Sequence, residues 1–242
     1  RIIFSKTFGS GIKNGEDVDG HGTHVSGIIA SSNAAYSGVA PGADIIALKV
    51  FDSPGAKVED ALAWCVANAD RYSIDVINMS LGWPKGYFQT DNSYKFDDFG
   101  YQDEINVLTD IGVICVAAAG NGYYGYLNRE TKQFDDYLVY GPGRNDVRAI
   151  DASVSSTQGI SMPAAFPNVI SVGATWASDP KVWYDTGNPE ALAIFSQRDD
   201  ELLDLVAYGG GVTSAAIGGS TVVQGGTSMS APYVSGLVLL MQ

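Results

Sequence analysis

The sequence has 242 residues, of which 45% are hydrophobic and 17% are charged. This composition excludes an intrinsically disordered chain and suffices for the core of one sizeable domain. The 27 Asp and Glu residues outnumber the 14 Lys and Arg residues, which gives a formal net charge of −13. Because such a surface repels phosphates and anionic lipids, we expect no nucleic-acid partner and no polybasic attachment to membranes.

The sequence also allows expectations about membrane spans, processing of the chain and the state of its two cysteines. No apolar run approaches the roughly 20 residues that cross a bilayer, so we predict no membrane span. The first residue is Arg1 rather than Met, and no signal peptide is recognisable, so we expect a processed product or a piece of a longer chain. Cys65 and Cys115 each lie among apolar neighbours, which favours free buried thiols over a disulfide bridge.

Short apolar runs alternate with segments of helical periodicity along the middle of the chain. Apolar runs of this kind are typical of strands covered on both faces, and the periodic segments place their apolar residues on one stripe. Strand, helix and strand at this spacing predict right-handed crossovers, and therefore an α/β fold with a mostly parallel central sheet. The expected elements are strand 43–51, helix 57–70, strand 75–81, helix 102–111, strand 113–118 and strand 168–174.

Two long segments, residues 82–100 and 122–167, lack clean periodicity. The second is far longer than an ordinary connection, so we interpret it as a set of functional loops or an insertion with a small structure of its own. No repeat or low-complexity linker divides the sequence. We therefore predict one domain over residues 1–242, with 122–167 as its atypical region.

Three stretches carry side chains that suit acyl transfer. His21 begins a predicted helix, Asn121 follows a buried strand, and Ser228 begins an apolar helix near the end of the chain. A serine hydroxyl is a weak nucleophile that needs a neighbouring base, which imidazole provides near neutral pH. A helix N-terminus and an Asn amide supply donors for a developing oxyanion. We expect Pro232 to be tolerated because it falls in the first turn of the serine helix.

Six stretches resemble those of the subtilisin-like serine proteases, the subtilases, in the order that the family has them. The resemblance implies a three-layer α/β fold with helices on both faces of the sheet. It also implies a secreted serine endopeptidase that acts on polypeptide substrates and requires no organic cofactor. The stretches are GHGTHVSG (20–27), GVAPGADIIALKV (38–50), DVINMSLG (75–82), VAAAGN (116–121), NVISVGA (168–174) and GGTSMSAPYVSG (225–236).

The resemblance assigns roles to individual residues. His21 is expected to be the general base, Ser228 the nucleophile, and Asn121 the oxyanion donor together with the Ser228 backbone N–H. Gly55 would begin, with Ala56, the edge strand that pairs with an extended peptide substrate. The residues expected to flank the primary specificity pocket are Ser80, Leu81, Gly82, Ala118, Ala119 and Gly120.

The chain departs from the family in its third catalytic residue. The family has an Asp well upstream of the His, in a motif like D-[ST]-G, and the 20 residues before His21 contain no such motif. Asp17 and Asp19 lie too close to His21 along the chain, and we interpret them as its polar lead-in. Three interpretations stay open: an enzyme whose Asp lies upstream of residue 1 or on a partner chain, a pseudoprotease that has lost it, and an unconventional internal Asp.

We further expect truncation at both ends, because family members continue beyond the serine helix, where this sequence stops at Gln242. The fragment alone is expected to be weakly active or inactive, and a missing N-terminal segment or a propeptide is an expected partner. Should the Asp be truly lost, the chain would be an inactive peptide-binding scaffold with the subtilase fold.

The candidate metal ligands in the sequence are its two histidines and three acidic pairs. His21 and His24 lie three residues apart, but the cysteines lack zinc spacing, so we predict that His24 is a structural hydrogen-bonding residue. The acidic pairs at 97–98, 135–136 and 199–200 are expected to be solvated surface, with structural calcium as the alternative. The loop of residues 31–37, where many subtilases hold calcium, offers Asn33 as its obvious oxygen ligand.

Overall fold

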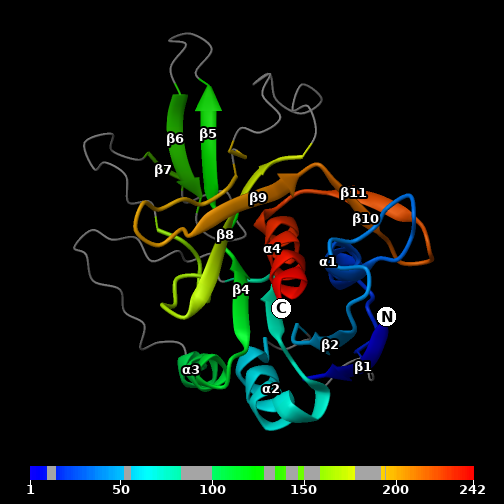
Figure 1. Cartoon of the computed structure of the whole chain (residues 1–242). Coiled ribbons are helices and arrows are strands. Elements are labelled where there is room, and N and C mark those ends of the chain that lie inside the picture. Colours follow the sequence, from blue (N-terminus) through cyan, green and yellow to red (C-terminus); the bar gives the residue numbers. More distant parts are fainter. Residues whose placement is uncertain are drawn as a thin grey trace.

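A parallel sheet of four strands lies at the centre of the computed structural model (Figure 1). Its strands, in spatial order, are β3 (Val76–Met79), β4 (Ile114–Ala118), β8 (Val169–Trp176) and β9 (Leu205–Gly210). All three neighbouring pairs run parallel. The predicted α/β fold with a mostly parallel sheet is confirmed, as are the strands expected at 75–81, 113–118 and 168–174.

The structure describes most of the chain, in several ranges. For β5, β6 and β7, introduced below, it describes the backbone alone. The described residues are 1–9, 15–51, 56–82, 100–127, 134–139, 147–149, 159–177, 192–193 and 195–242.

Helices cover both faces of this sheet. Helices α2 (Val58–Tyr72) and α3 (Gln102–Asp110) pack against each other on one face. Helices α1 (His21–Ala30) and α4 (Thr227–Met241) pack together on the other (Figure 1). The predicted helices at 57–70 and 102–111 are confirmed, and so is the three-layer arrangement.

The alternation of side chains along β4 produces these layers, because successive residues of a strand point to opposite faces. Cys115 and Ala117 belong to the apolar cluster formed with α2 and α3. Val116 and Ala118 pack instead with Val234 of α4. Cys115, Val116, Ala117 and Ala118 are all buried, so this strand lies in the middle of the core.

The two cysteines are free and buried, as predicted. Cys65 lies on α2 and Cys115 on β4, within the same apolar cluster. Burial raises the pKa of each thiol to about 12. Both side chains therefore act as small hydrophobic residues at neutral pH.

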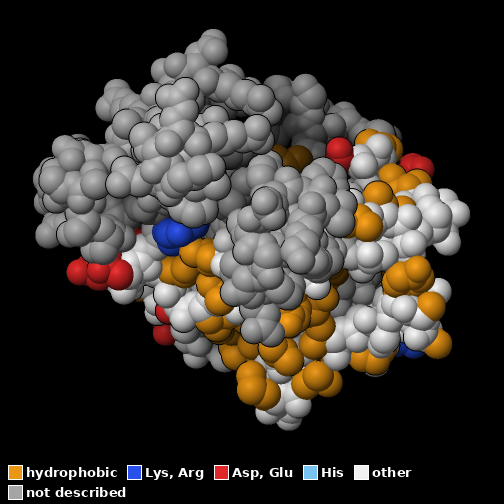
Figure 2. Space-filling model, turned by 90° about the horizontal axis from the view of Figure 1, so that it is seen from above, with side chains coloured by type: hydrophobic (Ala, Val, Ile, Leu, Met, Phe, Trp, Pro, Cys, Tyr) orange, Lys and Arg blue, Asp and Glu red, His pale blue; other side chains and the backbone are white. Residues whose placement is uncertain are grey.

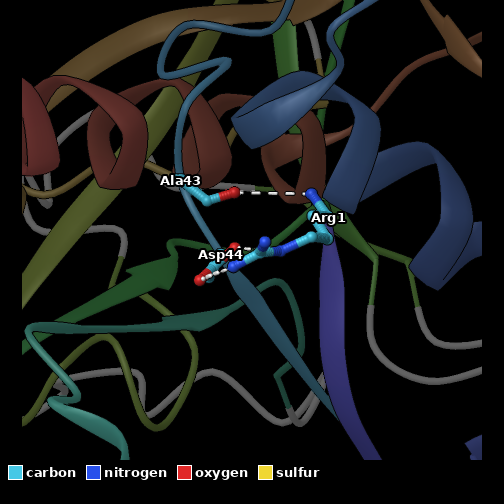
Figure 3. A network of polar contacts seen from close by, with 3 residues as sticks. All are labelled: Arg1, Ala43 and Asp44. Carbon is cyan, nitrogen blue, oxygen red and sulfur yellow. Dashed lines mark hydrogen bonds and ion pairs between the residues drawn. The ribbon is translucent and has the colours of Figure 1, made fainter.

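A second, two-stranded parallel sheet stands apart from the first. It consists of β1 (Ile2–Thr7), which was not predicted, and β2 (Ile45–Lys49), which lies within the predicted strand 43–51. Arg1 joins the starts of the two strands (Figure 3). Its Nε and Nη2 donate to the two carboxylate oxygens of Asp44 at 2.8 and 2.6 Å, and its terminal amine donates to Ala43 O at 3.4 Å.

The remaining described strands form two antiparallel sheets. A hairpin of β10 (Val212–Ala215) and β11 (Thr221–Gln224) packs beside α1. Strands β5 (Tyr123–Leu127), β6 (Phe134–Val139) and β7 (Val147–Ala149) form a small sheet at the top of Figure 1. The atypical region 122–167 thus contains a small structure of its own, one of the two alternatives the sequence allowed.

Hydrophobic side chains also gather on the face shown in Figure 2. In the described residues, exposed apolar side chains include Leu205 and Val206 on β9 and Leu237, Leu240 and Met241 near the end of α4. Within the part of the chain that the structure describes, no helix has the length and apolar character needed to cross a membrane.

Candidate active site

Ser228 occupies the second position of α4, next to the carboxyl end of β3. Its Oγ donates to Ser80 O at 3.3 Å, while Ser80 Oγ donates to Ser228 O at 2.7 Å. Asn78 Nδ2 donates in turn to Ser80 Oγ at 2.9 Å. This reciprocal pair fixes the start of the helix against the end of the strand.

Pro232 explains why Ser80 can make that bond. Pro232 is the sixth residue of α4, so the prediction that it lies in the first turn is wrong. A proline has no N–H to donate to the carbonyl four residues earlier, and here that carbonyl belongs to Ser228. The Ser80 hydroxyl supplies the missing donor.

Asn121 follows β4 and is oriented by Thr227. The Thr227 N–H and Oγ1 both donate to Asn121 Oδ1, at 2.8 and 2.9 Å. A backbone N–H can only donate, so the oxygen of the amide must face Thr227. The Nδ2 group then points the other way, and a Cβ placed on Gly226 would lie 3.2 Å from it. Asn121 is therefore held as a hydrogen-bond donor beside the first residues of α4.

His21 is the first residue of α1 and follows Gly20, whose φ of 98° lies in the left-handed region. The imidazole is partly buried. Burial lowers the pKa of His21 below its ordinary value, and the charges of Asp19 and Asp17 offset part of that shift. The ring is therefore neutral at pH 7, which is the form that can accept a proton.

Asp17 holds the turn that leads into α1. Its Oδ1 accepts from the N–H groups of Asp19 and Gly20 at 3.0 and 2.8 Å, and its Oδ2 accepts from Thr23 N and Oγ1 at 2.7 and 2.6 Å. Burial acts to raise the pKa of Asp17, but these hydrogen bonds outweigh it and lower the value. Four donors occupy this carboxylate, as expected of a lead-in residue and not of a partner for the imidazole.

Residues of the expected site line one cavity of about 2030 Å³. His21, Asn121 and Ser228 all line it, although the Ser228 hydroxyl donates to Ser80 and not to His21. Five of the residues expected to flank the specificity pocket line it as well, whereas Ala119 is fully buried and does not. Gly55 lies outside the described residues. The five are Ser80, Leu81, Gly82, Ala118 and Gly120.

The same cavity extends between β2 and β3. Every residue of both strands lines it, yet in the described strands β2 pairs with β1 and β3 pairs with β4. Leu62 of α2 lines it from one helix layer, and Val25 of α1 and Leu239 of α4 from the other. Interior strands of parallel sheets are buried on both faces, but every residue of β2 is partly exposed. The sheet layer is thus open here between two helix layers.

Two polar residues that the sequence did not suggest lie at the ends of β3 and β4. Ser161 Oγ donates to Gln197 Oε1 at 2.8 Å, and Ser161 N donates to Ala119 O at 2.7 Å. Both side chains are buried. No pattern near them points to this contact. The signal that was present is indirect, because a Cβ on Gly82 would crowd Ser161 and a Cβ on Gly120 would overlap both Ser161 and Gln197.

His24 fastens α1 to the hairpin, which confirms its predicted structural role. Its Nε2 lies 3.1 Å from both Val212 O and Val222 O. Because both partners are carbonyls, Nε2 must carry the proton. Burial lowers the pKa of His24, while the bonds to Val222 and Val212 act in the opposite direction.

Among the described residues, no three His, Cys, Asp or Glu side chains gather as a metal site requires. Asp199 is 6% exposed, so its predicted place on the solvated surface is wrong. Its Oδ1 accepts from Glu201 N and Leu202 N at 3.0 Å each, and its Oδ2 from Gly159 N at 3.1 Å. The pair at 97–98 lies outside the described residues, and at 135–136 the backbone alone is described.

The fold can be compared with known protein families. A family model described as the subtilase family matches residues 6–242. The chain belongs to the subtilase family.

Individual relatives agree with this assignment. The chain is 30% identical to subtilisin E of Bacillus subtilis (strain 168), over 93% of this chain and 46% of that protein. It is also 30% identical to M-protease of Shouchella clausii (strain KSM-K16), over 98% and 48%. Among solved structures it resembles sphericase, with a TM-score of 0.62 and 27% identity over 96% of this chain and 67% of that one. The chain thus spans about half the length of the first two relatives.

Proposed function

We propose that this chain is the part of an extracellular serine endopeptidase that carries the nucleophile, the base and the oxyanion donor. The observation that supports it most is that Ser228, His21 and Asn121, far apart in the sequence, line one cavity. Asn121 carries particular weight, because Thr227 fixes the amide oxygen and no described residue accepts from the Nδ2 group.

The proposed reaction uses each of these groups in turn. Ser228 Oγ exchanges its bond to Ser80 O for one to His21, and the neutral imidazole removes its proton as Oγ attacks the scissile carbonyl. Asn121 Nδ2 and the Ser228 backbone N–H donate to the oxyanion, aided by the helix dipole. The imidazolium then protonates the leaving amine, and water repeats the attack on the acyl-enzyme.

The open layer between β2 and β3 supports the hypothesis of an Asp upstream of residue 1. A strand placed there would pair with both free edges and bury apolar residues against both helix layers. In a parallel sheet its carboxyl end would lie at the same edge as Ser80, which contacts Ser228. An Asp at that end would face the imidazole of His21 and complete the triad.

The other expectations follow from the same proposal. The substrate is a polypeptide, no organic cofactor is required, and calcium is a structural ion where it binds. A propeptide or the missing N-terminal segment is the expected intramolecular partner. We propose that residues 1–242 form one domain, truncated at both ends, in which 122–167 is the family-atypical region.

A fluorophosphonate probe tests the proposal on the longer protein that includes the segment before Arg1. We expect the probe to label Ser228, and the His21→Ala variant to lose labelling because the hydroxyl then lacks its base. The matched control is His24→Gln, which changes the other histidine away from the nucleophile. Labelling of the His21→Ala variant at the rate of the parent would refute the assignment.

The alternative function is a peptide-binding scaffold without activity. The feature in its favour is that the described residues offer no carboxylate to the His21 ring beyond Asp17 and Asp19, whose contacts are with backbone and Thr23. The gene sequence upstream of Arg1 discriminates between the two. A D-[ST]-G strand there supports the enzyme, and a full reading frame without one supports the scaffold.

A further inference from the structure

The space between the ends of β3 and β4 has a floor made by Ser161. Residues Ser80–Gly82 continue from β3 and residues Ala118–Gly120 from the end of β4, and Ser161 lines the cavity between them. A Cβ placed on Gly82 would lie 3.0 Å from Ser161 Cβ, and one placed on Gly120 would overlap Ser161 Oγ. The serine side chain therefore contacts both edges and fills the space between them.

Gln197 lies behind Ser161 and locks it in place. Its Oε1 accepts from Ser161 Oγ at 2.8 Å and from Gly122 N at 3.4 Å, and its Nε2 donates to Gly159 O at 3.2 Å. Its backbone N–H donates to Gly120 O at 2.9 Å. Ser161 is 2% exposed and Gln197 1%, so neither side chain can move aside without losing these bonds in a dry environment.

The floor carries no charge among the described residues. Its groups are a hydroxyl, a carboxamide and backbone atoms, including Met162 O, which would lie 3.2 Å from a Cβ on Gly82. A charged substrate side chain placed here would be desolvated without an opposite charge to meet it. A large aromatic side chain would meet Ser161 before it could be buried.

We propose that Ser161, held by Gln197, makes the primary specificity pocket shallow and uncharged, so that the enzyme prefers a small neutral residue such as Ala or Ser on the acyl side of the scissile bond. This inference rests on the proposed function, because it names the substrate of the same site. It adds Ser161 and Gln197 as specificity-determining residues.

The test measures kcat/KM of the longer protein on peptides that differ only in that residue: Ala, Leu, Phe, Lys or Glu. We expect Ala to exceed Phe, Lys and Glu by at least about 10-fold, the scale on which pocket size discriminates. The Ser161→Gly variant should raise kcat/KM for Phe by about 10-fold, because it opens the space beneath both glycine edges. Ser220→Gly, an exposed serine between β10 and β11, is the matched control and should leave the order unchanged.

Each outcome has a distinct meaning. Highest kcat/KM for Leu, Phe, Lys or Glu in the parent protein would overturn the shallow neutral pocket but leave the protease proposal intact. Cleavage of none of the peptides, together with no fluorophosphonate labelling of Ser228, would overturn both. A series of peptide boronic acids with Ala or Phe at the same position reports the preference in the parent protein, even where Ser161→Gly fails to fold.

Discussion

Strand β3 has two edges, and they differ in what surrounds them. On one side it pairs with β4 from Val76 to Met79, and beyond that pairing Ser80 and Ser228 bond reciprocally. On the other side the same residues line a cavity that separates β3 from β2. The proposed nucleophile Ser228 bonds to Ser80 beyond the first side, and the proposed base His21 lines the cavity that opens on the second.

The difference separates two tasks of the site. The groups proposed to stabilise the oxyanion are held by contacts with described residues: Asn121 by Thr227, and Ser228 by Ser80. His21 has its backbone fixed through the Asp17 turn, but its ring lacks an orienting carboxylate among the described residues. In the proposed mechanism, the oxyanion donors are therefore already in position, whereas the imidazole of His21 needs one further element to orient it.

The largest expected effect is a loss of kcat when the proposed oxyanion donor Asn121 is changed. In the longer protein Asn121→Ala should lower kcat by about 10²–10³, the range measured for such a donor in subtilisin, with little change in KM. Asn121→Asp keeps both acceptor contacts to Thr227 but replaces the donor with an anion, so it should lose at least as much. An Asn121→Asp enzyme with parental kcat would show that orientation of Thr227, and not donation to the oxyanion, is the task of Asn121.

A smaller effect concerns the turn before His21. Asp17→Ala should lower the free energy of unfolding of the 242-residue chain by about 0.5–2 kcal/mol, because it removes the acceptor for Thr23 N in the first turn of α1 and for the N–H groups of Asp19 and Gly20 before it. The exposed Asp70→Ala is the control and should stay within about 0.5 kcal/mol of the parent in urea denaturation.

The Asp17 carboxylate also makes the stability of the chain depend on pH. Its pKa in the folded chain is lower than the ordinary 3.8, so the stabilisation is present at neutral pH and is lost as the pH falls below that value. The stabilities of parent and Asp17→Ala should therefore converge in acid. A difference that persists unchanged at low pH would contradict the capping role of the ionised group.

His24, one turn after His21 on α1, gives a comparison between the two histidines. Burial keeps the pKa of His24 below the ordinary 6.5, so the unfolded chain binds more protons than the folded one below that pH. Stability should then fall with decreasing pH, by at most about 1.4 kcal/mol per pH unit for one proton. His24→Gln, which keeps a donor for the two carbonyls, should flatten this slope in denaturation series from pH 7 to 5. An unchanged slope would place the titrating group elsewhere.

The smallest expected effect is a difference in alkylation rate between the thiol that lines the cavity and the thiol that does not. Cys65 lines the cavity and Cys115 does not. Both thiols should react slowly with iodoacetamide, because burial raises each pKa to about 12. Mass spectrometry should nevertheless find Cys65 modified faster in the 242-residue chain, and slower in the longer protein. Equal rates for both thiols in the two proteins would argue against a strand that fills the cavity.

The elements that could be predicted are those whose residues are buried on both faces. Strand β4 is a continuous apolar run because it lies between two helix layers. Strand β1 was missed because its residues IIFSKT mix polar and apolar types, and its first two side chains are exposed. The hairpin of β10 and β11 is stabilised through His24, a contact between residues nearly 200 positions apart that no local pattern reports.

Some residues of the candidate site could be predicted from the sequence and others could not. His21, Asn121 and Ser228 stand in motifs, so their placement on one cavity could be anticipated. Ser161 and Gln197 follow long irregular segments and are defined only by tertiary contacts, which is why they were missed. Pro232 was noticed, but its consequence was not, because the freed carbonyl finds its donor on another element.

A crystal structure of the longer protein with a peptide boronic acid tests the central claim most directly. We predict a covalent bond from Ser228 Oγ to boron, a boronate oxygen within hydrogen-bond distance of Asn121 Nδ2, and the His21 ring on the opposite side of the tetrahedral centre. A boronate bound away from Ser228, or an Asn121 amide turned from it, would contradict the account.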